Sequence, residues 1–139
     1  MIKIKKVDPR AMVPSYAHPG DAGMDLFALM NTTIKPGERT AVRTGVSMEI
    51  PDGCVGLIWD KSGIAIKEGL KTLGGVVDAG YRGEVLVGVI NLSDKPYTFE
   101  AGHKVAQMLI QKVESLPIQE VDELTDTSRG KGGFGSTGK

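Results

Sequence analysis

The stretch RTAVRTGVSMEIP, residues 39–51, decides the fold class. Every second residue in it is apolar or β-branched, which is the period of a strand with one buried face. A helix would instead need apolar residues at every third or fourth position, so the stretch predicts a β-strand. The alternating residues are Val42, Thr44, Val46, Met48 and Ile50.

Similar short runs, rich in β-branched residues, flank this stretch and are bounded by turn signals. KVAQMLIQKV also fits a helix, with Val105, Leu109 and Val113 or Met108 on one side, but we interpret it as a strand. Many short strands predict an all-β barrel or sandwich. The runs are IKIKKV (2–7), VGLIW (55–59), EVLVGVIN (84–91) and KVAQMLIQKV (104–113), with turns at Pro36-Gly37, Pro51-Asp52-Gly53 and Ala101-Gly102.

Composition narrows the class of protein. A chain of 139 residues and 14.8 kDa fits a single domain. Its 17 basic and 17 acidic residues leave no cationic surplus for binding nucleic acid. The lone Cys54 fits a reducing compartment, and we see neither a signal peptide nor an apolar span of roughly 20 residues. We therefore expect a soluble, cytoplasmic protein with no nucleic-acid or membrane partner.

The C-terminal segment DTSRGKGGFGSTGK (126–139) is almost entirely glycine and polar residues, too little to drive folding alone. We divide the chain into a β-barrel domain, 1–125, and a mobile arm, 126–139. The letters of residues 130–135 satisfy G-x-G-x-x-G, but no buried strand precedes them and no helix follows. A disordered solubilising tail is the simple alternative. Phe134 argues against it, because an aromatic ring isolated among glycines could stack on a flat base.

Five separated segments, in order, resemble the five motifs of the trimeric dUTPase family. The resemblance implies a jelly-roll-like β-barrel protomer and a homotrimer with three active sites between subunits, each completed by a mobile arm. It also implies hydrolysis of dUTP to dUMP and pyrophosphate with Mg²⁺. The segments are PGDAGMDLFA (19–28), DKSGIA (60–65), GVVDAGYRGE (75–84, continuing to Asn91), GHKVAQMLI (102–110) and RGKGGFGSTG (129–138).

Roles on the nucleoside side follow from the third segment. By resemblance, Asp78 polarises the water that attacks the α-phosphorus, although a plain turn aspartate is the alternative. Tyr81 resembles the family tyrosine that packs on the deoxyribose and leaves no room for a 2′-hydroxyl, although a half-buried strand tyrosine is the alternative. By the same resemblance, the backbone of the hairpin 70–81, including Gly75 and Val76, would bind the uracil edge.

The resemblance also implies roles on the phosphate side, carried by the first, second and fourth segments. Ser62 and the Gly63 amide would contact the phosphates, with Lys61 supplying charge. Gln107 would face them, although a polar residue on an exposed strand face is the alternative. Asp25 anchors the metal-site network and joins Asp78 and Ser62 in the catalytic set; a buried turn aspartate is its alternative. We expect Mg²⁺ to be held by phosphates and water, with no direct protein ligand.

The arm supplies the remaining contacts expected from the resemblance. Arg129 clamps the γ-phosphate and Phe134 lies over the uracil, while Gly133, Gly135, Ser136 and Thr137 contact the substrate. Closure of the arm would exclude water from the site.

Two residues depart from the common pattern of the dUTPase family. Lys61 stands where arginine is usual, so the bidentate fork is lost. Thr72 stands where many members have asparagine, six residues before Asp78, which suggests relaxed base selectivity.

Two other functions remain open. A dCTP deaminase shares the fold but would need a glutamate near Gly88. A regulatory binding protein with the same pocket is the second alternative.

Overall fold

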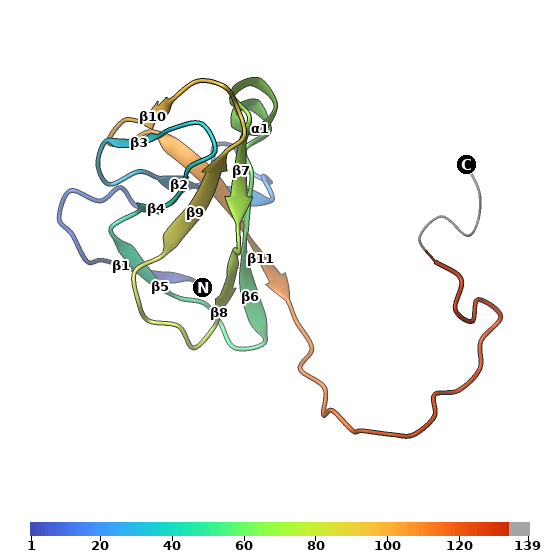
Figure 1. The fold of residues 1–139 in the computed structure, drawn as a ribbon. Coiled ribbons are helices and arrows are strands. Elements are labelled where there is room, and N and C mark those ends of the chain that lie inside the picture. The colour runs from blue at the N-terminus through green and yellow to red at the C-terminus, as the bar shows by residue number, and fades with distance from the viewer. Residues whose placement is uncertain (134–139) are drawn as a thin grey trace.

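The computed structural model describes residues 1–133, which form eleven strands and one short helix (Figure 1). This confirms the predicted all-β class. The strands are β1 (Lys3–Lys6), β2 (Gly23–Phe27), β3 (Thr32–Ile34), β4 (Arg39–Arg43), β5 (Val46–Glu49), β6 (Cys54–Trp59), β7 (Leu70–Leu73), β8 (Val76–Asp78), β9 (Leu86–Asn91), β10 (Tyr97–Phe99) and β11 (Lys104–Lys112), and the helix is α1 (Ser62–Glu68).

The strands pair only in antiparallel fashion within the described residues. The largest sheet has the order β2-β11-β6-β8, and a second has the order β4-β9-β7. Two ribbons, β1-β5 and β3-β10, complete the fold. Strands far apart in sequence are therefore neighbours, and β11 in particular lies between β2 and β6.

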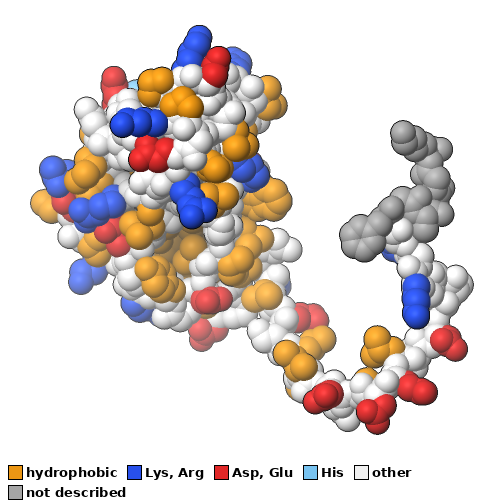
Figure 2. All heavy atoms as spheres, in the orientation of Figure 1, with side chains coloured by type: hydrophobic (Ala, Val, Ile, Leu, Met, Phe, Trp, Pro, Cys, Tyr) orange, Lys and Arg blue, Asp and Glu red, His pale blue; other side chains and the backbone are white. Residues whose placement is uncertain are grey.

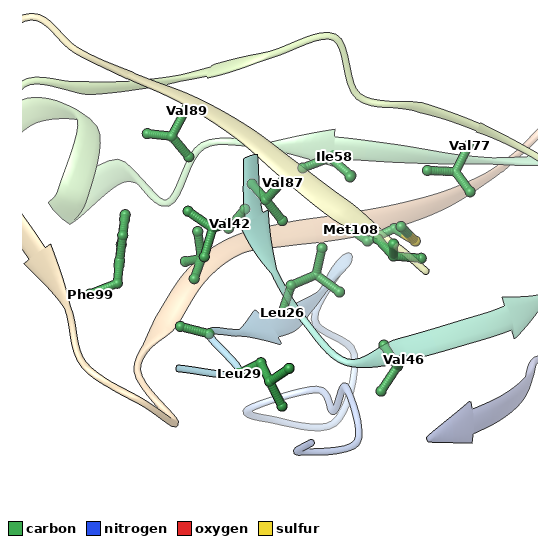
Figure 3. Close-up of a cluster of buried hydrophobic side chains, with 14 of the residues drawn as sticks. Leu26, Leu29, Val42, Val46, Ile58, Val77, Val87, Val89, Phe99 and Met108 are labelled. Carbon is green, nitrogen blue, oxygen red and sulfur yellow. The ribbon is translucent and has the colours of Figure 1, made fainter. Parts of the chain in front are cut away.

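One hydrophobic core fills the space between the sheets (Figure 3). Val42, Val87 and Val89 from the β4-β9-β7 sheet contribute to it, together with Leu26 and Met108 from the larger sheet. All five are at most 2% exposed, so burial of branched aliphatic side chains is the main stabilising term.

The stretch 39–51 forms two strands instead of one. β4 pairs with β9, and β5 pairs with β1. Between them Gly45 has a positive φ of 71°, which redirects the chain into a different ribbon. All five alternating residues are at most 3% exposed, so the predicted periodicity is confirmed and only the predicted continuity is wrong.

The other predicted runs are confirmed as strands β1, β6, β9 and β11, the last of which resolves the choice between strand and helix for 104–113. Helix α1 was not predicted. Its seven residues, SGIAIKE, contribute no fully buried side chain, so they carry no amphipathic signal. The helix ends where Gly69 takes a left-handed conformation.

After β11 the chain leaves the barrel as an extended segment, residues 113–133, with no helix or strand (Figure 1). Its last backbone hydrogen bond to the barrel runs from the Val113 N–H to the Gly53 carbonyl, 2.9 Å. Acidic and apolar side chains alternate along it (Figure 2), and Leu116, Ile118 and Leu124 are exposed. No helix within residues 1–133 has the length and apolar character needed to cross a bilayer.

Candidate active site

Asp25 lies in a row of residues aligned across three strands. Asp25 of β2 is the register partner of Gln107 of β11, and Gln107 is in turn the partner of Trp59, the last residue of β6. The chain then runs directly through Asp60 and Lys61 into α1. The order of strands in the sheet therefore brings together residues from three of the five segments.

The Asp25 carboxylate is buried, with 3% of the residue exposed, and each of its oxygens accepts a hydrogen bond from a lysine. Lys61 Nζ donates to Oδ1, and Lys104 Nζ lies 2.7 Å from Oδ2. Burial alone would raise the pKa of Asp25, but the hydrogen bonds from Lys104 and Lys61 outweigh it and lower the pKa. The three side chains thus carry one net positive charge. We use "Asp25 cluster" for Asp25, Lys61, Ser62, Gly63, Lys104 and Gln107.

Ser62 and Gly63 begin helix α1, and the extended Lys61 precedes them. The N–H groups in the first turn of a helix have no partner within that helix. A Cβ on Gly63 would meet no described heavy atom within 4 Å, so packing within this chain does not require glycine there. The first turn therefore offers a hydroxyl and N–H donors on an unobstructed surface.

Gln107 is half-buried beside this loop, and its Nε2 donates to the Asp60 carbonyl oxygen at 2.9 Å. The bond fixes the amide next to the chain that leads to Ser62. Asp25, Lys61, Ser62, Gly63 and Gln107, all predicted for the phosphate side, therefore come from one region of one chain.

Asp60 connects the loop before α1 to strand β7. Its carboxylate accepts hydrogen bonds from the Thr72 N–H at 2.7 Å and the Thr72 hydroxyl at 2.8 Å, and pairs with Lys71 Nζ at 2.9 Å. Burial would raise the pKa of Asp60, but the hydrogen bonds from Lys71 and Thr72 lower it. Sequence reasoning gave no role to Asp60 or Lys104, because nothing in the spacing shows which cation meets which carboxylate.

A separate set of residues lines a surface hollow of about 220 Å³ at β8, which we call the Asp78 hollow. The Asp78 side chain accepts no hydrogen bond from any group in residues 1–133, whereas the Tyr81 hydroxyl donates to the Glu84 carbonyl oxygen at 3.0 Å. The residues predicted to meet the water and the sugar therefore share one hollow. Its lining is Val76, Val77, Asp78, Tyr81, Glu84, Val85 and Leu86.

The backbone conformation and close packing at position 75, just before this hollow in sequence, require a glycine. Its φ is 106°, and a Cβ there would lie 2.8 Å from the Ile58 carbonyl oxygen. The Ile58 N–H donates to the Gly75 carbonyl at 2.8 Å, so the two chains are held in close contact. Packing alone explains this glycine, and its ligand contact stays a prediction.

The strand register places the Asp25 cluster and the Asp78 hollow toward opposite ends of β6. Asp78 pairs with Val55 near the start of β6, while Gln107 pairs with Trp59 at its end. Val55 and Trp59 are four steps apart along the strand, about 13 Å at the usual rise per residue. The structure therefore does not bring Asp78 and Ser62 together within one chain.

Arg129 and Gly133, the described arm residues predicted to bind substrate, belong to neither the Asp25 cluster nor the Asp78 hollow. Arg129 is exposed in the extended segment, and its Nε donates to the Gly132 carbonyl at 3.0 Å, so its contacts are local. Gly133 is the last described residue of the arm. Phe134, Gly135, Ser136 and Thr137 lie outside the described residues.

Gly88 lies in the middle of β9, opposite Leu73 of β7. A Cβ there would lie 2.9 Å from the Leu73 carbonyl oxygen, so a glutamate would not fit without a backbone shift. This packing disfavours the deaminase alternative.

Among residues 1–133, no three His, Cys, Asp or Glu side chains lie close enough to hold a metal ion. Both oxygens of Asp25 already accept from lysines. The described chain therefore offers no protein cage for a metal.

Comparison with known proteins identifies the family. The family model described as dUTPase matches residues 10–138. The chain is 49% identical over 142 residues to the deoxyuridine 5'-triphosphate nucleotidohydrolase of Rhodococcus erythropolis, covering 99% of this chain and 85% of the relative. It is 44% identical over 137 residues to the enzyme of the same name from Clostridium kluyveri, covering 97% and 96%.

Solved structures agree with the sequence comparison. The dUTPase of Staphylococcus bacteriophage 80alpha with dUpNHpp superimposes with a TM-score of 0.94 at 28% identity, covering 100% of this chain and 99% of that one. A mutant dUTPase from phage phi11 of S. aureus, in which a structural Mg(II) ion is coordinated, gives 0.82 at 26% identity, covering 88% and 97%. The family match over nearly the whole chain and the shared fold lead to one conclusion: this chain belongs to the dUTPase family.

Proposed function

We propose that the protein hydrolyses dUTP to dUMP and pyrophosphate. The observation that carries the proposal is the presence, in a member of the dUTPase family, of two complementary groups of residues. The Asp25 cluster has a net positive charge and open donors, which suit a triphosphate. The Asp78 hollow combines an unpaired carboxylate with a fixed tyrosine ring, which suit a nucleoside and a reactive water.

The nucleoside would bind in the Asp78 hollow. Tyr81 would pack on the deoxyribose, and the backbone around Gly75 and Val76 would hydrogen-bond the uracil edge. The hydroxyl of Tyr81 is already bonded to Glu84, so the ring is held in place before the substrate arrives. A fixed ring excludes a 2′-hydroxyl by its volume.

Thr72 lies beside Asp60 and Lys71 and does not line the Asp78 hollow. Its hydroxyl donates to the Asp60 carboxylate at 2.8 Å and accepts from Lys71 Nζ at 3.4 Å, so one lone pair of that oxygen is left to accept from a ligand. Uracil presents a donor at N3, whereas cytosine presents an acceptor there. We propose that this lone pair favours uracil over cytosine, and a comparison of kcat/KM for dUTP, dTTP and dCTP tests it against the relaxed selectivity expected from the sequence.

The triphosphate would bind to the Asp25 cluster. Lys61 would contribute charge, Ser62 and the Gly63 N–H would donate to phosphate oxygens, and Gln107 has a second amide N–H to offer. Stabilising the charge on these oxygens as the bridging bond breaks is the main catalytic requirement of phosphoryl transfer.

Asp78 would act as the general base. Its carboxylate would accept a proton from a water whose oxygen attacks the α-phosphorus in line. The bond from that phosphorus to the bridging oxygen breaks, and pyrophosphate leaves. Because no group in residues 1–133 donates to the Asp78 side chain, the carboxylate is available to a water.

Mg²⁺ would enter the site bound to the phosphates of the substrate. Mg²⁺ keeps several waters and commonly binds through substrate phosphates, so the absence of a cage among residues 1–133 is compatible with its use. When bound, the ion would neutralise charge on the phosphate oxygens. The chain's own part is to place the phosphates beside Lys61 and Ser62.

A homotrimer would join the two groups of residues. Reacting atoms must approach to about 3–3.5 Å, yet Val55 and Trp59, which mark the two levels on β6, lie about 13 Å apart. The Asp78 of one subunit and the Ser62 of a neighbour would therefore form each site. Exposed apolar side chains near both ends, including Trp59 at 54% and Val76 at 68%, are available for subunit contacts.

The arm, residues 126–139, would complete the site. Arg129 is an exposed cation whose one hydrogen-bond partner within residues 1–133 is the nearby Gly132 carbonyl, so we propose that it reaches a γ-phosphate. Gly133, Gly135, Ser136 and Thr137 would contact the substrate, and Phe134 would cover the base.

Chromatography of the reaction products tests the proposal. The purified protein with Mg²⁺ should convert dUTP to dUMP and pyrophosphate, with kcat/KM higher for dUTP than for dTTP or dCTP. Formation of dUTP or dUMP from dCTP would instead support the deaminase, and intact dUTP after long incubation would overturn the proposal.

A further inference from the structure

The Asp25 carboxylate has more positive charge around it than it needs. One buried carboxylate accepts from two ammonium groups, Lys61 on one oxygen and Lys104 on the other. A single lysine would balance the charge. The second lysine therefore needs an explanation other than neutrality.

The two lysines differ in how they are attached to the fold. Lys104 is the first residue of β11 and is the register partner of Phe27 on β2, two residues from Asp25 and on the same face of that strand. Lys61 precedes the first turn of α1 and lies in the loop beside Ser62. Lys104 is thus tied to the strand that carries Asp25, and Lys61 to the loop proposed to bind phosphate.

Both ammonium groups sit on flexible four-carbon stems and can move without a backbone change, since the Lys61 side chain is 28% exposed and the Lys104 side chain 48% exposed. Position separates them, because Lys61 lies in the loop beside Ser62 and is the ammonium group placed to reach phosphates there. If Lys61 were the only partner, its departure would leave Asp25 as a buried and unpaired charge, which is strongly unfavourable. A second cation removes that penalty.

We propose that Lys104 is a positioning residue: it stays on Asp25 as the permanent counterion and so frees Lys61 to move from Asp25 to the substrate phosphates. This inference rests on the proposed function, since it assumes that phosphates bind beside Ser62. Lys104 itself does not touch the substrate in this arrangement. Its effect is transmitted through the charge balance of Asp25.

Binding of the non-hydrolysable analogue dUpNHpp, measured by titration calorimetry, separates this role from a structural one. Replacing Lys104 by methionine leaves Lys61 as the only counterion, which holds it on Asp25. The loss of one charge-assisted phosphate contact should weaken binding by about ten- to a hundredfold. Lys104→Arg should stay within about threefold of the unchanged protein, because arginine can also pair with the carboxylate.

The double variant Asp25→Asn, Lys104→Met is the decisive case. A neutral amide no longer holds Lys61, so the double variant should bind dUpNHpp as tightly as Asp25→Asn alone. The matched control is Lys112→Met, because it removes the same charge from the exposed far end of β11. It should leave binding unchanged.

The outcomes distinguish the possible explanations. Equal binding by Lys104→Met and Lys112→Met would overturn the inference. So would a double variant that binds more weakly than Asp25→Asn, because Lys104 would then contact phosphate directly or support the fold. If Lys104→Met alone fails to fold, the comparison in the Asp25→Asn background still decides. Failure of the unchanged protein to bind dUpNHpp would overturn the proposed function and, with it, this inference.

Discussion

Mixing two inactive variants should restore activity if the Asp78 hollow of one subunit works with the Asp25 cluster of another. Asp78→Asn removes the proposed base and leaves the Asp25 cluster intact. Ser62→Ala damages the Asp25 cluster and leaves the Asp78 hollow intact. Removing a general base or one anion-binding donor costs about 10²–10³ in rate or more, so each variant alone should retain about 1% activity or less.

The size of the recovery follows from the arrangement of the trimer. In a cyclic trimer, each site draws one group of residues from one subunit and the other group from its neighbour. With random assembly from equal amounts, a given site combines an intact Asp25 cluster and an intact Asp78 hollow in about one quarter of cases. The mixture should therefore recover about a quarter of the unmutated activity. A site formed within a single chain would recover none.

The assay is steady-state release of pyrophosphate from dUTP after the two variants are unfolded in urea and refolded together. Each variant refolded alone gives the background, and the unmutated protein refolded alone sets full activity. Light scattering checks that the refolded species is a trimer.

A second mixture provides an internal control. The double variant Ser62→Ala, Asp78→Asn refolded with the unmutated protein should give about one quarter of full activity when sites lie between subunits, but about one half when each chain has its own site. The shared site would be refuted if the mixture of Asp78→Asn with Ser62→Ala gave only background activity and the mixture of the double variant with the unmutated protein gave one half of full activity.

Three further changes have outcomes that follow from the structure. Asp78→Asn should lower kcat by about 10²–10⁴-fold with affinity for dUpNHpp and the melting temperature nearly unchanged, while Asp94→Asn, at an exposed turn, should leave all three unaltered. Gly75→Ala would place a Cβ 2.8 Å from the Ile58 carbonyl at a φ of 106°, so urea denaturation should show about 1–3 kcal/mol less free energy of unfolding; unchanged stability would contradict the contact. The lowered pKa of Asp60 means that its stabilising effect is complete above the unfolded pKa of about 3.9 and is lost as pH falls through the lower folded pKa. Asp60→Asn should therefore flatten the dependence of unfolding free energy on pH below about 4, and a slope equal to that of the unmutated protein would count against this account.

The fold was predictable where periodicity and burial coincide. Val42, Val46 and Ile50 alternate in sequence and are all buried, because a strand with one face against the core imposes that pattern. The break at Gly45 was not predictable, since Gly45 is one of nine glycines with positive φ within residues 1–133 and its conformation leaves no mark on the periodicity of the strands. Helix α1 was missed for the related reason that none of its side chains is fully buried.

The sequence predicts a set of candidate site residues, but it does not predict how they are arranged. Asp25 and Gln107 become neighbours because β11 enters between β2 and β6, and such long-range pairing cannot be read from local sequence. Lys104 lies in the segment GHKVAQMLI (102–110), but its pairing with Asp25 depends on a strand register that only the folded chain defines. The hydrogen bond from Thr72 to Asp60 likewise joins two segments whose contact the sequence does not show, and the effect of Thr72 on base selectivity stays a prediction.

The interior of the protomer is complete without a partner, so the reason for assembly into a trimer must lie elsewhere. Its core is continuous, and within residues 1–133 no buried side-chain nitrogen or oxygen lacks a hydrogen-bond partner. Assembly is therefore not needed to complete the interior of the protomer. For the proposed site, the protomer lacks proximity between Asp78 and Ser62, because the register places them toward opposite ends of β6. A trimer would supply that proximity, so Trp59→Ala, which removes an exposed apolar side chain with no assigned substrate contact, should lower hydrolysis by weakening subunit contacts while the separated protomers stay folded.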